Sequence, residues 1–205
     1  MHKVEKELIN QCPPRICRWI DAKPLPVSGN SKDKEAAYGY AESGMGKGYK
    51  LHAIADESQG FVAWTVREMN LCEWSVADEL IAQLDSEGYL IGDGGYDSNR
   101  LYDLAWEKSI QLIALRRYRK AKGLGHRPNS PHRLRALSLQ ETAMGRGLLA
   151  SRNNIETMFA QLTNLGCGLS PLPNWVRSLF RVEMWVRGKM IIYNLWRQKA
   201  KSNAA

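Results

Sequence analysis

The sequence predicts a mixed α/β protein in which antiparallel strands come first and strands joined through helices follow. Two patterns predict this fold class. Residues 48–57 and 61–68 are alternating, β-rich runs joined by turn residues 58–60, as in a hairpin. After them, short apolar runs alternate with stretches of helical periodicity, as in chains whose strands are connected by helices. On these patterns alone, several folds of the class remain open.

The elements of the first half follow from local composition. Residues 1–11 predict a short charged helix or a frayed end. Residues 16–27 are apolar around a single acid, Asp21, and predict the first strand. The Gly, Ser and charged residues of 28–47 predict a mobile loop before the hairpin. Apolar residues three and four apart predict a helix over 76–85.

The second half alternates strands and helices. Residues 89–93 are a short apolar strand that ends in Asp93 and is followed by two glycines. Asp97 or Ser98 is expected to cap the next helix. The remaining elements expected are a helix over 99–108, a strand over 110–115, a basic loop over 116–135, helical residues over 137–163 and a long final helix over 174–198.

The final helix is rich in large aromatic residues. We expect them to pack against the sheet, with stacking on DNA bases as the alternative. They are Trp175, Phe180, Trp185, Tyr193 and Trp196.

Composition excludes several protein classes. The chain has 205 residues, of which 44% are hydrophobic and 24% charged, as is usual for one globular domain. A disordered tail, a collagen-like fibre and a disulfide scaffold are therefore excluded. No run reaches about 20 apolar residues, and no apolar signal core begins the chain, so we expect no membrane partner and a cytoplasmic, nucleoid-associated location. The four cysteines form no CxxC pair, so a zinc site is not expected.

The net charge of +8 is unevenly distributed. Residues 1–107 hold 11 basic and 18 acidic side chains, a net charge of −7, whereas residues 108–205 hold 18 and 3, a net charge of +15. Residues 108–140 alone hold nine basic side chains and no acid. Such a concentration favours a polyanionic partner over a merely solvated loop.

Three acids lie in or beside apolar segments, where burying a carboxylate costs free energy that a function can justify. Asp21 interrupts the first strand, Asp93 ends a later one, and Glu156 lies among apolar residues of a helix. In-line attack on a phosphodiester needs an activated water or 3′-hydroxyl and a stabilised leaving oxygen, and two Mg²⁺ ions about 3.5–4 Å apart do both. Mg²⁺ prefers carboxylate oxygens. Each acid alone is more typical of a cap or turn, but the three together favour metal-dependent phosphodiester chemistry.

Several segments then become recognisable. The segments IDAKPLPV, KGYKLHAI, GYLIGDGGYDSN, GLGHRPNSPHRLRA and RNNIETMFAQLTN resemble the catalytic domain of DDE-type insertion-sequence transposases. The resemblance is to the group with a Tyr-x2-Arg-x3-Glu-x6-Lys signature, and it runs from about residue 18 to the C-terminus. It implies a ribonuclease H-like mixed sheet flanked by helices, two bound Mg²⁺ or Mn²⁺ ions, and cutting and rejoining of DNA at transposon ends.

The resemblance also assigns roles. Asp21, Asp93 and Glu156 match the three catalytic, metal-binding acids, and Arg152 is placed to hold a phosphate because it lies one helical turn before Glu156. Asp97 is the competing second acid, and we prefer Asp93 because it closes the strand whereas Asp97 occupies a cap position. The other expected DNA-binding residues are Arg116, Arg117, Arg119, Lys120, Lys122, Arg127, Arg133 and Arg135.

The chain departs from the family pattern at three places. The signature Tyr falls at Leu149 and the signature Lys at Thr163, so one phosphate contact is missing unless the basic loop or Arg177 replaces it. Asp21 is too close to Met1 for the usual N-terminal DNA-binding domain. We therefore expect residues 1–205 to be a single catalytic domain without that module.

The expected partner is double-stranded DNA, as transposon ends and target, and a homodimer is a further expectation. Two alternatives stay open. One is an inactive transposase remnant that only binds DNA. The other is a ribonuclease H-like nuclease for RNA–DNA hybrids.

Overall fold

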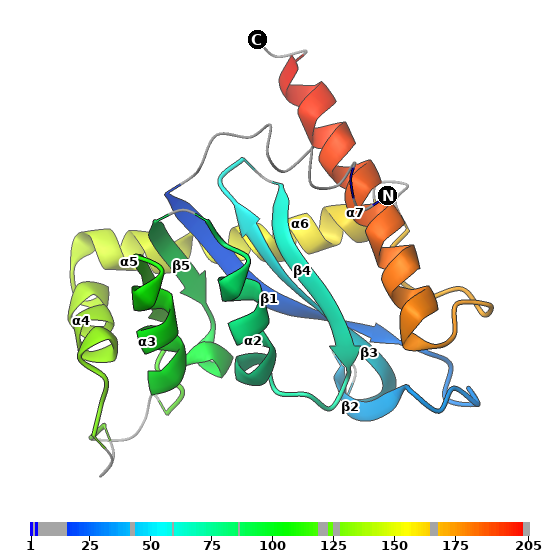
Figure 1. Ribbon diagram of the computed structural model, residues 1–205, viewed down its shortest axis with the longest axis horizontal. Coiled ribbons are helices and arrows are strands. Elements are labelled where there is room, and N and C mark those ends of the chain that lie inside the picture. The colour runs from blue at the N-terminus through cyan, green and yellow to red at the C-terminus, as the bar shows by residue number, and fades with distance from the viewer. Residues whose placement is uncertain are drawn as a thin grey trace.

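The computed structural model describes residues 1, 3, 16–41, 44–58, 60–85, 87–118, 123–124, 128–164 and 168–202 (Figure 1). Most of the expected N-terminal helix, residues 1–11, lies outside these ranges. In the described residues, no helix is long and apolar enough to cross a membrane.

Among the described residues, a six-stranded mixed sheet forms the centre of the molecule, in the order β2-β3-β1-β5-β6, with β4 pairing β3 on the same edge as β2. β1 pairs antiparallel with β3 and parallel with β5, and β5 pairs parallel with β6. The predicted hairpin is confirmed. The strands are β1 Cys17–Pro26, β2 Ala37–Ala41, β3 Gly44–Asp56, β4 Phe61–Glu68, β5 Gly88–Gly92 and β6 Ile110–Ala114.

Helices cover both faces of the sheet (Figure 1). On one face α2 (Glu73–Ala82), α3 (Asn99–Glu107) and α4 (Pro131–Gln140) close a core that includes Ile20 and Leu90. On the other face α6 (Asn153–Asn164) and α7 (Leu179–Ser202) close a core around Trp19. The remaining elements of the described residues are the short η1 (Gly94–Tyr96) and α5 (Ala143–Ala150). The mixed α/β sheet flanked by helices is as predicted and is consistent with a ribonuclease H-like fold.

Three element predictions need correction. The expected loop 28–47 contains β2 and the start of β3, because β3 runs on past the hairpin to pair with β2. The expected basic loop 116–135 gives way at Pro131 to α4, whose first turn is capped by the Ser130 hydroxyl. The final helix begins at Leu179, five residues later than predicted.

The aromatic residues in and before the last helix only partly follow the prediction that they pack on the sheet. Tyr193 is fully buried and Trp185 partly so. By contrast, Trp175, Phe180 and Trp196 are 63%, 70% and 42% exposed. The prediction is therefore wrong for these three, because the helix buries a different face.

Candidate active site

The parallel pairing of β1 with β5 brings the first two acids together. The paired residues end at Trp19 and Ile91, and the same register continued by two residues sets Asp21 beside Asp93. Asp21 lies mid-strand, and its carboxylate accepts a hydrogen bond of 2.8 Å from the Ala22 N–H. Asp93 follows β5 and caps η1, accepting 2.8 Å from the Gly95 N–H.

The third acid reaches the site through Arg152. The Trp19 indole N–H donates 2.8 Å to the Ser151 hydroxyl, which ties β1 to the turn before α6. Arg152 follows that serine directly, and its guanidinium lies 3.8 Å from an Asp21 oxygen and 2.7 Å from a Glu156 oxygen. One cation thus forms ion pairs with two acids that are 135 residues apart in sequence.

The environment of Asp21 is strongly acidic. Burial raises the pKa of Asp21 to about 6; the negative charges of Asp93 and Glu73 also raise it, while the Ala22 hydrogen bond and the charge of Arg152 lower it. Burial and the same carboxylates raise the pKa of Tyr96, whose buried hydroxyl has no hydrogen-bond partner in the described structure. The cluster has more negative charge than Arg152 alone offsets.

Sequence reasoning missed Glu73. It begins α2, and its carboxylate lies against Gly95, where a Cβ would clash with a Glu73 oxygen and lie 2.9 Å from an Asp93 oxygen. Lys50 on β3 lies 3.6 Å from it. A first-turn acid on an amphipathic helix is so common that nothing in the sequence distinguishes this one, although the paired glycines after Asp93 mark the close approach.

Asp97 has a different role from Asp93. Its side chain, only 2% exposed, accepts 2.6 and 2.7 Å hydrogen bonds from the Arg133 guanidinium and 3.0 Å from the Arg117 N–H. The carboxylate of Asp97 also holds the pKa of Arg133 above its usual value. The N-cap of α3 is Ser98, so Asp97 is not the cap. It joins η1 to α4 instead.

The predicted DNA-binding residues do not form one group. Arg116 donates to the Gly123 carbonyl, and Arg117 is exposed with its guanidinium 5.8 Å from the centre of the Tyr118 ring. Arg133 is bonded to Asp97. The others, Arg119, Lys120, Lys122 and Arg127, lie outside the described residues.

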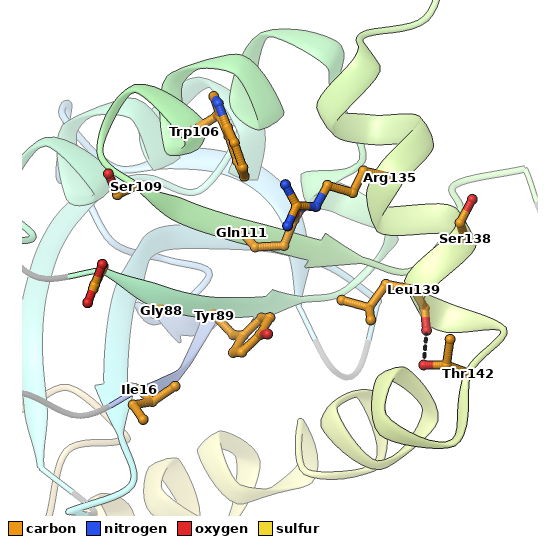
Figure 2. A pocket seen from close by; sticks show the side chains of 11 residues that line it. Ile16, Gly88, Tyr89, Trp106, Ser109, Gln111, Arg135, Ser138, Leu139 and Thr142 are labelled. Atoms are coloured by element: carbon orange, nitrogen blue, oxygen red, sulfur yellow. Dashed lines mark hydrogen bonds between the residues drawn. The ribbon is translucent and has the colours of Figure 1, made fainter.

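Arg135 lies in a cavity at the opposite end of the sheet. Figure 2 shows its side chain extending from α4 towards Gln111 and Trp106, and its guanidinium lies 4.7 Å from the Trp106 ring centre. The cavity, about 620 Å³, is lined also by Gly88, the first residue of β5, whereas Asp93 follows the last. Arg135 is therefore remote from the acids along the strands.

The acids suit a hard divalent cation. Asp21 and Asp93 offer neighbouring carboxylate oxygens, the ligands that Mg²⁺ prefers. Among the described residues, no three His, Cys, Asp or Glu side chains are grouped so that they hold a metal ion as they stand. Glu156 forms an ion pair with the Arg152 guanidinium. The donors therefore fit a cation at Asp21 and Asp93, with Glu156 as a neighbour.

Leu149 and Thr163, which replace the signature Tyr and Lys, both have structural contacts. Leu149 is partly buried against the core, and the Thr163 hydroxyl donates 2.9 Å to the Phe159 carbonyl within α6. Arg177 bonds to groups of its own turn, at Pro173, Asn174 and Val176. In these contacts, neither Thr163 nor Arg177 takes the place of the signature Lys as a phosphate-binding cation.

Comparison with known families gives one clear result. Residues 13–195, nearly the whole chain, match the transposase DDE domain family. No curated protein and no solved structure gives a significant match. The matched segment includes Asp21 on β1, Asp93 directly after β5 and Glu156 on α6, and the chain belongs to the transposase DDE domain family.

Proposed function

We propose that residues 1–205 act as a single catalytic domain that cleaves DNA at transposon ends and transfers the strands, using Mg²⁺ or Mn²⁺. The observation that carries the proposal is the convergence at one end of the sheet of Asp21, Asp93 and, through Arg152, Glu156. Membership of the transposase DDE domain family supports the general class of reaction.

Asp21 and Asp93 would hold the divalent ions, and Glu156 would complete the ligands. The chemistry that such ions would supply there is a lower pKa of an attacking water or 3′-hydroxyl and stabilisation of the leaving oxygen. The attacking oxygen forms a bond to phosphorus while the bond from phosphorus to the leaving 3′-oxygen breaks, which yields a hydroxyl ready for strand transfer. Burial of Asp21 keeps its oxygens from full hydration.

Arg152 would position the scissile phosphate. A guanidinium binds phosphate through paired N–H donors as it binds a carboxylate. A DNA phosphate would therefore compete with Asp21 and Glu156 for Arg152, and exchange of Glu156 for phosphate would free its carboxylate for a metal ion. This exchange of partners at Arg152 would couple DNA binding to completion of the metal site.

DNA would also be held by the basic residues after β6. Arg116, Arg117 and the expected contacts at 119–122 and 127 carry this part of the proposal. Arg133 is left out because its guanidinium is bonded to Asp97, and Arg135 because it extends into the distant cavity.

The test is nicking of supercoiled plasmid with Mg²⁺ or Mn²⁺. The parent should convert it to open circles, while a chain with Asp21→Asn, Asp93→Asn and Glu156→Gln together should not. Equal, metal-independent conversion by both proteins would exclude the proposal. Retention of DNA without nicking would favour the inactive remnant, and preference for RNA–DNA hybrid over duplex would favour the ribonuclease.

A further inference from the structure

The long helix α7 has apolar residues on two opposite faces. One face packs on the body of the protein through Val182, Val186, Met190 and Tyr193, each no more than 1% exposed. A helix with a second apolar face is expected to have a second partner. Nothing in the described part of the chain covers that face.

The second face is a row of side chains spaced four residues apart, which we call the outer stripe. Its members are Phe180, Met184, Gly188, Ile192 and Trp196. The four side chains are exposed by 70% (Phe180), 41% (Met184), 50% (Ile192) and 42% (Trp196). A Cβ at Gly188 would meet open space. Leu195 and Trp175 flank it with exposures of 46% and 63%.

The exposed apolar area is large for one chain. At about 200 Å² for a whole aromatic side chain, Trp175, Phe180 and Trp196 together expose about 350 Å². The aliphatic members add to this, so the patch reaches the upper range of about 300–600 Å² for the largest patch on a monomer. A hollow of about 380 Å³ runs along it, with Gly188 among its lining residues.

The outer stripe is symmetric about its centre. Gly188 lies at the midpoint, Met184 and Ile192 lie four residues to either side, and Phe180 and Trp196 lie eight residues to either side. Two helices that cross are closest at the crossing point and diverge beyond it. A residue without a side chain at the centre and aromatic residues at the ends match that shape.

We propose that α7 pairs with α7 of a second copy of this chain, antiparallel, about a two-fold axis at Gly188. The axis sets Met184 against the second copy's Ile192, and Phe180 against its Trp196. Such an interface is isologous, because one patch serves both subunits. Rows of residues four apart are the ridges through which helices commonly pack. The pairing is independent of the proposed chemistry.

DNA is a weaker candidate for this surface. Stacking on bases needs free ring faces. Trp175 and Trp185 form a T-shaped pair with ring centres 5.6 Å apart, and Trp196 lies 6.1 Å from Tyr193 with the Arg197 guanidinium 5.4 Å from the Trp196 ring centre, so both exposed tryptophans already have ring or cation neighbours. The centre of the stripe is aliphatic and carries no base-stacking group.

The experiment is sedimentation velocity of the full chain without DNA, from micromolar to submillimolar concentration. The parent should sediment as a dimer, and Met184→Glu should weaken the dimer about tenfold or more because two buried charges result. Adding Ile192→Lys to that variant should restore it, since each glutamate then faces a lysine of the other copy. Within one helix these positions are two turns apart and do not pair.

Tyr40→Glu is the matched control, because Tyr40 is 78% exposed on β2 and lies outside the stripe. It should leave the dimer unchanged, and circular dichroism should show all variants folded. A monomeric parent overturns the proposal, as does a Met184→Glu variant as dimeric as the parent. A variant that keeps the dimer but loses DNA binding assigns the stripe to DNA instead.

Discussion

Replacing Asp97 with asparagine should destabilise the fold, whereas the same change at Asp93 should not. Asp97 is 2% exposed and receives two hydrogen bonds from Arg133, itself 12% exposed. Removing one partner of a buried, paired charge costs about 3–5 kcal/mol because the other charge stays buried. Since the asparagine side chain would keep one acceptor oxygen, we expect Asp97→Asn to lower the free energy of unfolding by about 3 kcal/mol.

Asp93→Asn should change stability by less than about 0.5 kcal/mol, since asparagine caps a helical turn as well as aspartate does. The substitution also removes a negative charge beside Asp21. Stability is measured by urea unfolding followed through tryptophan fluorescence, for which the chain has seven tryptophans.

A double-mutant cycle isolates the ion pair. The double variant Asp97→Asn, Arg133→Gln should lose less free energy of unfolding than the two single variants lose in sum, by about 1–2 kcal/mol. Additive costs, or an Asp97→Asn variant as stable as the parent, would refute the structural role of Asp97. The distinction between the two neighbouring acids would then be lost.

Three further predictions concern other parts of the molecule. Ser151→Ala should lower the free energy of unfolding by about 1–2 kcal/mol in denaturant titrations, because the buried Trp19 N–H loses its acceptor. Burial, with the charges of Lys50 and Arg67, lowers the pKa of His52 from 6.5 to about 3, so its contribution to stability is complete above pH 6.5 and is lost as pH falls. Between pH 7 and about pH 5 the free energy of unfolding of the parent should fall by about 2 kcal/mol more than that of His52→Leu. Curves of unfolding free energy against pH that run parallel for the two proteins would contradict this. The logarithm of the DNA-binding constant should fall linearly with the logarithm of the salt concentration, with a slope of about −0.9 for each phosphate that the protein neutralises. Arg117→Gln should make this slope shallower by about 1, and an unchanged slope would exclude a phosphate contact at Arg117.

Much of the fold could be predicted because the strands carry their own signals. The run from Phe61 to Glu68 alternates and is bounded by turns, and the structure gives the strand these bounds. β2 was missed because Ala37–Ala41 is an edge strand with Gly39 and exposed tyrosines, and its pairing with β3 is a tertiary contact. α4 was missed because basic residues and prolines suggest a loop, although Pro131 is suited to a first helical turn.

The candidate site shows the same limit. Asp21 and Asp93 could be selected because each acid stands out in an apolar strand, and parallel strands bring such positions together. Glu73 could not, because its approach to Gly95 depends on how α2 packs over the sheet. The pairing of Asp97 with Arg133 depends likewise on α4, 36 residues further along the chain.

Mn²⁺ binding measured by electron paramagnetic resonance tests directly, and without requiring activity, whether Asp21 and Asp93 hold divalent metal ions. The parent should bind Mn²⁺, and Asp93→Asn should weaken binding by more than about tenfold. Asp78→Asn is the control, because that carboxylate pairs with Arg100 instead. Mn²⁺ binding by Asp93→Asn as tight as that of the parent would contradict the account.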